Sequence, residues 1–282
     1  MPTSPPIITL TTDFGWRDHY VGAVKGVILG ICRNATIVDL SHHVPAQDVV
    51  HGSFVIGESH RSYPNDTVHL CVVDPGVGTD RRAVVLITPY GRFVAPDNGI
   101  LTRVVGALRD ESEAYVCCSG PGLVPVPEGC HAYVLNEPSF WLHPVSNTFH
   151  GRDVFGPVAA HLARGVEPAD LGSPTEVLTV MRGTPPRILP GSIEGAVIYV
   201  DSFGNLVTNI AGESVGTRPL VLSIARRRVE GPARTFADSE GLMALVGSFG
   251  YLEVALGGGS AASDLGVDVG EPVSVSFGPQ AL

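Results

Sequence analysis

The chain has 282 residues, of which 44% are hydrophobic, and carries a formal net charge of −10 at pH 7. This length can form one large domain or two medium ones, and the apolar content excludes a disordered chain. The acidic balance argues against a phosphate-backbone binder, so we expect no nucleic-acid partner. No apolar run approaches the roughly 20 residues that span a bilayer, so we expect no membrane partner either.

Segments typical of strands and helices alternate through the first part of the chain. Residues 18–32 carry valines and isoleucines at helical spacing, which predicts a helix with one buried face. The other expected elements are strands at 7–12, 36–40, 67–73, 82–88 and 92–95 and helices at 49–59, 99–108 and about 153–163. This order predicts an α/β domain over residues 1–168 with a largely parallel central sheet.

The second part of the chain follows a different pattern. Five prolines and no sustained periodicity between residues 165 and 190 predict a Pro-rich linker over residues 169–190. Beyond it the hydrophobic period becomes two, and strands are expected at 196–200, 206–210, 220–224, 252–256 and 273–277. With Gly-rich turns between them, these strands predict a smaller, all-β, barrel-like domain over residues 191–282.

The five cysteines are odd in number and form no C-x-x-C pair. We therefore expect reduced, mostly buried thiols in a cytoplasmic protein. The N-terminus has no charged region followed by a long apolar stretch, so no signal peptide is expected.

The segment around Asp74 is the most informative part of the sequence. β-branched residues lead into Asp74 and a Pro/Gly turn, and Arg81 follows seven positions later. Ligands of open α/β sheets bind where strands end, so a carboxylate and a guanidinium at this place indicate a built site. A structural Asp-Pro turn with a surface arginine is the alternative.

Two further polar residues stand next to expected helices. Asp13 follows the first strand, where a carboxylate can hold a ribose diol or cap the next helix. His150 precedes a helix start, where it is either a titrating group or an ordinary loop histidine. His42 and His43 are adjacent on a strand and point to opposite faces, so we expect structural or surface histidines and no metal site.

A turn in the second domain offers three kinds of contact within five residues. Asp201 supplies a carboxylate, Phe203 an aromatic face and Asn205 an amide. Together they suit a flat heteroaromatic base, with Phe203 stacking, Asn205 reading the base edge and Asp201 holding an amine. An ordinary hairpin with a buried Phe is the alternative.

These segments together resemble the S-adenosyl-L-methionine (SAM) hydroxide adenosyltransferases, or SAM hydrolases, which are relatives of the SAM-dependent fluorinase and chlorinase. The resemblance covers nearly the whole chain. Its motifs are TDFG at 12–15, DPGVGTDRR at 74–82, APDNG at 95–99, TFHGRD at 148–153, FGN at 203–205, TN at 208–209 and residues 247–262. Each motif is short, but their order makes the match specific.

The resemblance implies an N-terminal α/β domain, a C-terminal β-barrel and a homotrimer with SAM bound at subunit interfaces. The implied catalytic residues are Asp74, Arg81 and His150, which would promote attack of water on the ribose C5′ to give adenosine and L-methionine. The implied substrate contacts are Asp13 for ribose, Phe203 and Asn205 for adenine, Asp201 and Ser248 for the methionine amine and carboxylate, and Glu253 at the rim. SAM is the substrate, and no metal or other cofactor is implied.

The sequence departs from the halogenase relatives at two positions. This chain has Phe249 where those relatives have an arginine, and Gln47 where they have an aromatic residue. A halogenase forming 5′-chloro-5′-deoxyadenosine is disfavoured, because those relatives replace Asp74 with tyrosine and lack the Arg/His pair. A non-catalytic SAM- or adenosine-binding protein and a purely structural trimer are two further interpretations that the sequence leaves open.

Overall fold

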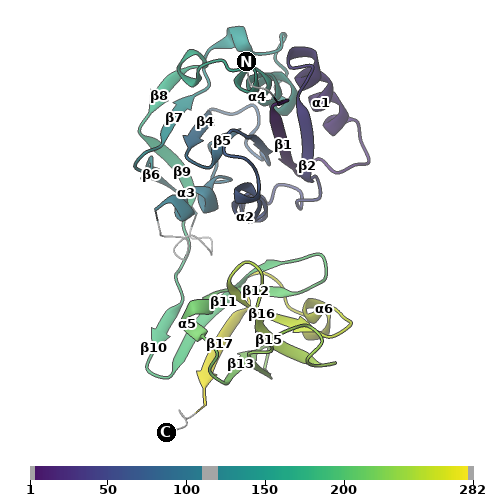
Figure 1. The fold of residues 1–282 in the computed structure, drawn as a ribbon, viewed down its shortest axis with the longest axis vertical. Helices are drawn as coiled ribbons and strands as arrows, with labels where there is room; N and C mark the ends of the chain where they lie inside the picture. The colour runs from purple at the N-terminus through teal and green to yellow at the C-terminus, as the bar shows by residue number, and fades with distance from the viewer. Residues whose placement is uncertain (1–3, 110–119, 279–282) are drawn as a thin grey trace. The chain divides into compact units, whose positions relative to one another are not determined.

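The computed structural model describes residues 4–109 and 120–278, which divide into two compact units (Figure 1). The N-terminal unit comprises residues 4–109 and 120–181, and the C-terminal unit comprises residues 182–278. Half of the expected linker, 169–190, is occupied by strands β8 (Ser173–Thr175), β9 (Val177–Met181) and β10 (Arg187–Leu189). Pro174 fits into β8 because that strand is at the edge of its sheet, where a missing N–H is tolerated.

Within the described residues, the N-terminal unit is built on a seven-stranded mixed sheet with the order β2-β1-β3-β5-β4-β7-β8. Its strands are β1 (Ile7–Thr12), β2 (Thr36–Ser41), β3 (Val68–Val72), β4 (Ala83–Thr88), β5 (Gly91–Pro96), β7 (His131–Val134) and β8. The pairs among β2, β1, β3 and β5 are parallel, whereas β4, β7 and β8 add antiparallel pairs. The α/β class is confirmed, and the sheet is mixed. A separate ribbon pairs β6 (Pro121–Pro125) with β9.

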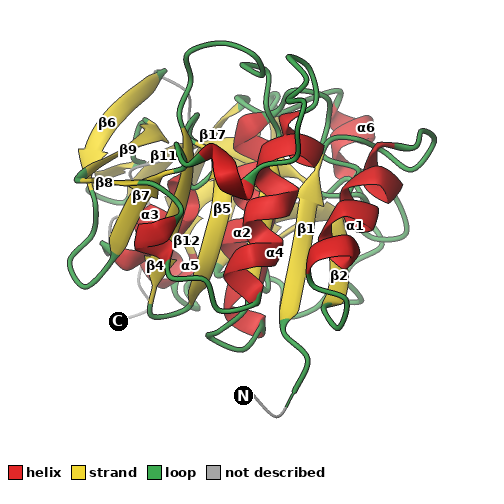
Figure 2. Cartoon of the chain, turned by 90° about the horizontal axis from the view of Figure 1, so that it is seen from above, coloured by secondary structure: helices red, strands yellow, loops and turns green. Residues whose placement is uncertain are grey.

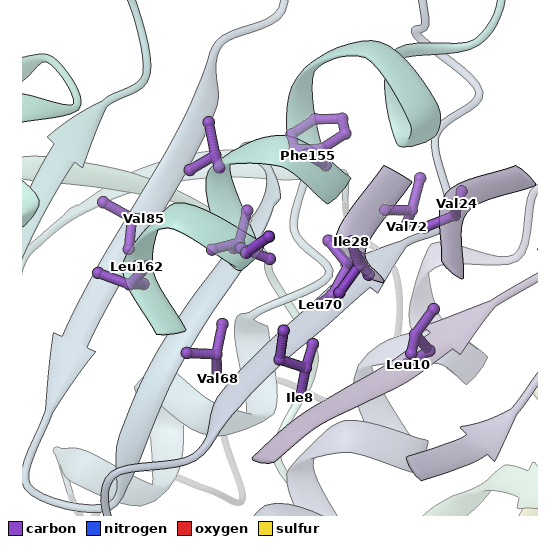
Figure 3. Packing of buried hydrophobic residues seen from close by; sticks show 14 of the residues in the cluster. Ile8, Leu10, Val24, Ile28, Val68, Leu70, Val72, Val85, Phe155 and Leu162 are labelled. Carbon is purple, nitrogen blue, oxygen red and sulfur yellow. The ribbon is translucent and has the colours of Figure 1, made fainter. Parts of the chain in front are cut away.

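Helices cover both faces of this sheet. They are α1 (Tyr20–Ile31), α2 (Val49–Ser59), α3 (Thr102–Leu108) and α4 (Gly156–Ala163), with 3-10 turns at His60–Ser62, Pro138–Phe140 and Pro168–Asp170. Alternate strand residues such as Ile8 and Leu10 pack with Val24 and Ile28 of α1 and Leu162 of α4 (Figure 3). Figure 2 shows β1 and β2 side by side.

The opposite face of the sheet meets α2, and α3 packs against α2. Val72 belongs to the cluster under α1 and α4, and the next residue, Val73, packs at Gly52 of α2, because successive residues of an extended segment face opposite ways. Asp48 is the N-cap of helix α2, and its side chain accepts a hydrogen bond from the His51 N–H at 2.9 Å.

The C-terminal unit is an almost closed antiparallel barrel. Its strands are β10, β11 (Ser192–Val200), β12 (Leu206–Ala211), β13 (Leu220–Ile224), β14 (Arg227–Gly231), β15 (Leu242–Val246), β16 (Tyr251–Leu256) and β17 (Pro272–Phe277). The short helices are α5 (Gly212–Val215) and α6 (Ala261–Leu265). Strands β14 and β15 lie at the two ends of the path, and the bridge between Ala233 and Leu245 brings those ends together. The predicted all-β domain is confirmed.

Cys32, Cys71 and Cys130 are buried free thiols, and burial raises the pKa of each. The predictions for Cys117 and Cys118 fall outside the described residues. None of the helices in the described ranges is long and apolar enough to span a membrane.

Candidate active site

Two predicted acids lie at the same edge of the N-terminal sheet. Strands β1 and β3 are parallel neighbours, with Thr12 paired to Val72. Asp13 follows the first of these residues directly, and Asp74 follows the second by two positions. Because the carboxyl ends of parallel strands meet at one edge, the backbone brings the two carboxylates into one region, and both line the same cavity.

Asp74, Arg81 and His150 form a continuous hydrogen-bonded chain. The Arg81 guanidinium donates two hydrogen bonds to the Asp74 carboxylate. Nε lies 2.9 Å from Oδ1, and Nη2 lies 2.5 Å from Oδ2. The same Nη2 lies 2.9 Å from Nδ1 of His150. The Asp74 and Arg81 side chains are only 6% and 12% exposed, and the guanidinium carbon stacks 5.1 Å from the ring centre of Phe155. Burial of a bidentate pair holds these groups in a single geometry.

This geometry defines the protonation state of His150. A guanidinium carries only donors, so Nδ1 of His150 accepts the hydrogen bond and the proton of the neutral ring sits on Nε2. Burial and the Arg81 charge lower the pKa of His150, against the opposing influence of Asp74 and Asp153. The imidazole is therefore neutral at pH 7.

Buried polar contacts fix the loop that carries His150. Asp153 has no exposed surface, and its carboxylate accepts a hydrogen bond from the Ser146 N–H at 2.8 Å and pairs with Arg152. Gly78, at φ +79°, approaches this loop so closely that a Cβ there would lie 2.3 Å from the carbonyl oxygen of Asn147. The loop after β3 and the loop before His150 are thus in direct backbone contact.

The cavity at this sheet edge has a volume of about 220 Å³, and we call it the carboxylate cavity. It is lined by Asp13, Phe14, Gln47, Val72, Asp74, Pro75, Val77, Thr148, Phe149, His150 and Gly151. Asp13 accepts a hydrogen bond from the Gln47 N–H at 2.8 Å. Arg81 does not line the cavity, but it contacts two residues that do, Asp74 and His150. Ligand pockets usually measure about 300–1,000 Å³, so this cavity fits part of a ligand.

In the C-terminal unit, Asp201 organises the turn between β11 and β12. Its Oδ1 accepts the N–H groups of Phe203 and Asn205, each at 2.9 Å, and its Oδ2 accepts the Asn205 side-chain amide at 2.8 Å. The turn buries Asn205 and leaves Phe203 76% exposed. The alternative interpretation, an ordinary hairpin with a buried Phe, is therefore wrong, because the Phe203 ring is exposed.

A second cavity, of about 720 Å³, lies beside this turn, and we call it the aromatic cavity. It is lined by Asp201, Phe203, Asn205, Phe236, Ser248, Phe249, Glu253, Leu256, Gly258 and Gly259. All five of the predicted contacts in the second domain are therefore brought together. A hollow of about 880 Å³ elsewhere on this unit contains none of the predicted residues, and its lining includes residues of β11, β13 and β17.

Glu253 is the most perturbed group in the aromatic cavity. It is 4% exposed, and burial, reinforced by the charge of Asp201, raises the pKa of Glu253 to about 7. Gly247 makes room for it, since a Cβ at that position would lie 1.8 Å from Oε1 of Glu253. A carboxyl held this way is poised between its neutral and charged forms at physiological pH.

Several lining residues were not among the predicted contacts. Phe14, Thr148 and Phe149 belong to motifs that were recognised, but their individual roles need the tertiary structure. Phe236 belongs to no recognised motif; an aromatic residue in a polar loop, between Thr235 and Asp238, was the only signal.

The histidine pair is structural. His42 is buried between Thr12 and Asp39, with ring nitrogens at 2.7 Å and 2.9 Å from their oxygens, and His43 is exposed. Among the residues that the structure describes, no cluster of three His, Cys, Asp or Glu side chains is placed to hold a metal ion.

Comparison with known proteins gives a consistent result. Residues 8–172 match the SAM hydroxide adenosyltransferase N-terminal domain, and residues 195–274 match the C-terminal domain. The chain is 37% identical to the (R)-S-adenosyl-L-methionine hydrolase of Salinispora arenicola, over 98% of this chain and 99% of that protein. A more distant relative, the fluorinase of Nocardia brasiliensis, is 27% identical over 97% of both chains.

A solved structure supports the same relationship. The crystal structure of an uncharacterized conserved protein from Thermotoga maritima superposes with a TM-score of 0.82 at 32% identity, covering 96% of this chain and 99% of that one. The two domain models, a full-length relative above 30% identity and the superposition on a solved structure all indicate the same family. The chain belongs to the SAM hydroxide adenosyltransferase family.

Proposed function

We propose that this protein hydrolyses SAM to adenosine and L-methionine. The observation that carries the proposal is the chain of Asp74, Arg81 and His150 at the carboxylate cavity, in a sequence that matches a (R)-S-adenosyl-L-methionine hydrolase over nearly its full length. No observation favours a halogenase, because a buried carboxylate and a neutral imidazole suit water better than a halide anion.

The reaction is a displacement at the ribose C5′. The oxygen of water or hydroxide bonds to C5′, the C5′–S bond breaks, and sulfur keeps the electron pair as a neutral thioether. The leaving group takes no proton, so no general acid is needed, and the proton lost from water passes to the solvent. In-line approach opposite sulfur is the geometric demand that the protein must meet.

Asp74 and His150 orient the attacking water, and Arg81 fixes both and supplies positive charge near the developing hydroxide. Since Nδ1 of His150 already accepts from Arg81, His150 serves first as an orienting group. Deprotonation of water by His150 would require this contact to open.

The two cavities divide the substrate between them. Asp13 holds the ribose hydroxyls in the carboxylate cavity, and Phe203 and Asn205 hold adenine in the aromatic cavity. Asp201, Ser248 and Glu253 face the methionyl end. We place the complete site in a homotrimer, where the N-terminal unit of one subunit meets the C-terminal unit of the next, and the reaction in the cytoplasm, which suits the buried free thiols.

The reaction needs no cofactor, because the sulfonium is already an activated leaving group. We therefore expect dialysis against a chelator to leave the turnover rate unchanged within about twofold, as the mechanism contains no Lewis acid step. Activity measured before dialysis and after re-addition of Mg²⁺ or Zn²⁺ provides the check. A large loss that one of these metals restores would contradict this mechanism.

The decisive experiment is incubation of the purified protein with SAM in ¹⁸O-labelled water, with and without chloride. Both sulfonium epimers are assayed, because the name of the relative specifies an (R) form. Labelled adenosine and methionine, formed independently of chloride, are the expected products by mass spectrometry. A chlorinated nucleoside would assign the protein to the halogenases. Intact SAM with saturable binding would make it a binding protein.

A further inference from the structure

The charge of the aromatic cavity does not match the charge of a whole methionyl group. Its lining contains two carboxyl groups, Asp201 and Glu253, and, among the described residues, no lysine, arginine or histidine. The methionyl end of SAM carries an ammonium and a carboxylate. The cavity therefore offers a charged partner to the ammonium and none to the carboxylate, for which only the Ser248 hydroxyl and backbone N–H groups remain.

The two carboxyl groups are not equivalent. Asp201 already accepts three hydrogen bonds from Phe203 and Asn205, and it serves to shape its own turn. Glu253 is buried, its side chain packs against Gly247, and within the described part of the chain it has no hydrogen-bond partner. A buried carboxyl group without a partner gains most from a cation that enters the cavity.

We infer that Glu253 binds the amino end of the substrate as a cation and that the carboxylate of the substrate contributes little to recognition. Adenosyl sulfonium amines that lack this carboxylate are therefore substrates as good as SAM. The inference rests on the proposed function and extends it to a second class of substrate. Phe249 supports it, because this residue lines the cavity with a ring that offers no hydrogen-bond donor to a carboxylate.

Decarboxylated SAM is the simplest member of this class. Its cleavage follows the same course: water oxygen bonds to C5′, the C5′–S bond breaks, sulfur keeps the electron pair and one proton passes to solvent. The products are adenosine and 3-(methylthio)propylamine. The compound has one more net positive charge than SAM. It is therefore better matched to a cavity whose only ionisable lining residues, in the described ranges, are the acids Asp201 and Glu253.

The test compares kcat/KM for decarboxylated SAM and for SAM, together with Kd values from calorimetry. We expect the ratio of the two kcat/KM values to be about one third or higher, since no buried ion pair is lost with the carboxylate. In a site that held the carboxylate with an arginine, the ratio would fall about a hundred-fold. A ratio below one third overturns the inference and leaves SAM hydrolysis standing.

If neither compound is cleaved, the proposed function fails and the claim about substrates fails with it. The ratio of the two Kd values then decides, by the same limit, only whether the carboxylate contributes to binding. If another subunit supplies a cation that binds the substrate carboxylate, the protein will prefer SAM to decarboxylated SAM. That preference would count against the inference.

Two variants test the residues. Glu253→Gln should weaken the binding of decarboxylated SAM about tenfold and leave the Kd of adenosine, which has no amine, within about twofold. Equal weakening of both ligands would assign Glu253 a structural role and overturn the inference. Phe249→Arg should shift the kcat/KM ratio about tenfold toward SAM by providing a partner for the carboxylate.

Val269→Arg, at an exposed position away from the cavity, is the control for added charge. The inference requires the shift in Phe249→Arg and its absence in Val269→Arg. An equal shift in both variants, or in neither, would contradict it.

Discussion

Arg81 owes its role to geometry rather than to charge alone. Its fork binds both oxygens of Asp74, and one of its nitrogens also reaches His150. A lysine could supply the charge but could not make both contacts, because an ammonium on a flexible stem presents no planar fork. The Arg81→Lys and Arg81→Ala variants therefore separate orientation from electrostatics.

We expect Arg81→Ala and His150→Ala to lower kcat for SAM hydrolysis about a hundred-fold or more and to leave SAM binding within a few-fold, as for loss of a group that acts in the transition state. Arg81→Lys should recover only a small part of this loss. His150→Gln keeps an acceptor for Arg81 and should retain more activity than His150→Ala. Wild-type kcat in any alanine variant would remove that residue from the mechanism.

Glu253 makes the stability of the free protein depend on pH. Its pKa is about 7 in the folded protein and about 4.5 in the unfolded chain. A raised pKa in the folded state means that its stabilising contribution is complete below about pH 4.5 and is lost as pH rises through 7. The shift corresponds to a free-energy difference of order 3 kcal/mol.

We therefore expect Glu253→Gln to unfold with nearly the wild-type free energy at about pH 4 and to be more stable than wild type by about 2–3 kcal/mol at about pH 8. Urea denaturation of both proteins across this range, without substrate, gives the difference. Other titrating groups cancel between the two proteins. A difference that does not vary with pH would show that Glu253 titrates normally.

At the scale of elements, the site depends on the contact between two loops. Gly78 and Gly129 have similar positive φ angles, but only Gly78 meets a neighbouring backbone oxygen. An alanine at either position suffers the conformational strain of about 1 kcal/mol, and an alanine at Gly78 also collides with Asn147. The pair therefore separates strain from displacement of the loop.

We expect Gly78→Ala to lower kcat at least about tenfold, because the shifted loops separate Arg81 from His150, while Gly129→Ala stays near wild-type activity. Steady-state kinetics and the free energy of unfolding should be measured for both variants. Similar kcat values in the two variants would mean that the contact between the loops does not position the site.

The sequence allowed the long regular elements to be predicted, because they carry strong periodic patterns. Helix α2 was predicted with its observed bounds, and the strand leading to Asp74 was placed within a residue at each end. Strands β6–β10, β14 and β15 were not predicted. Strands β6, β7, β8, β10 and β14 are short or contain Pro, Gly or Arg, and β9 and β15 are short, mainly apolar segments without strict alternation of polar and apolar residues. Their pairing is decided by tertiary contacts.

The candidate site was predicted as a set of residues but not as an arrangement. The parallel order of β1 and β3 explains why Asp13 and Asp74 could be expected together. The hydrogen bond between Arg81 and His150 spans 69 positions of sequence, and no local pattern encodes it. A π-helical turn at Gly151–Phe155 precedes α4, where a regular helix was expected from about 153, and this irregular start also follows from packing.

For the whole molecule, the division of predicted contacts between two cavities is the feature with the widest consequence. Asp13, Asp74 and His150 line one cavity, and Asn205 and Glu253 line the other. If complete sites form between subunits, two differently inactivated chains can restore each other. If they form within one chain, they cannot.

We expect a mixture of His150→Ala and Asn205→Ala subunits, co-expressed in equal amounts, to recover about a quarter of wild-type sites, because random assembly pairs an intact N-terminal unit with an intact C-terminal unit at that frequency. Activity per subunit, with oligomer mass from light scattering, provides the measurement. Each variant expressed alone is the control. No recovery in a mixed trimer would refute sites shared between subunits.

The hydrogen bonding of the Arg81 guanidinium to both Asp74 and His150 has one more consequence. Its contacts to Asp74 and His150 are made entirely by side chains of this protein, and the stacking on Phe155 keeps the fork in place. In the proposed mechanism, the dipoles around the attacking oxygen are thus preorganised during folding, and little reorganisation free energy remains for the chemical step. Substrates that differ only in the chain attached to sulfur on the side away from the ribose should therefore share one activation barrier for the displacement at C5′. Their rates should differ through binding alone.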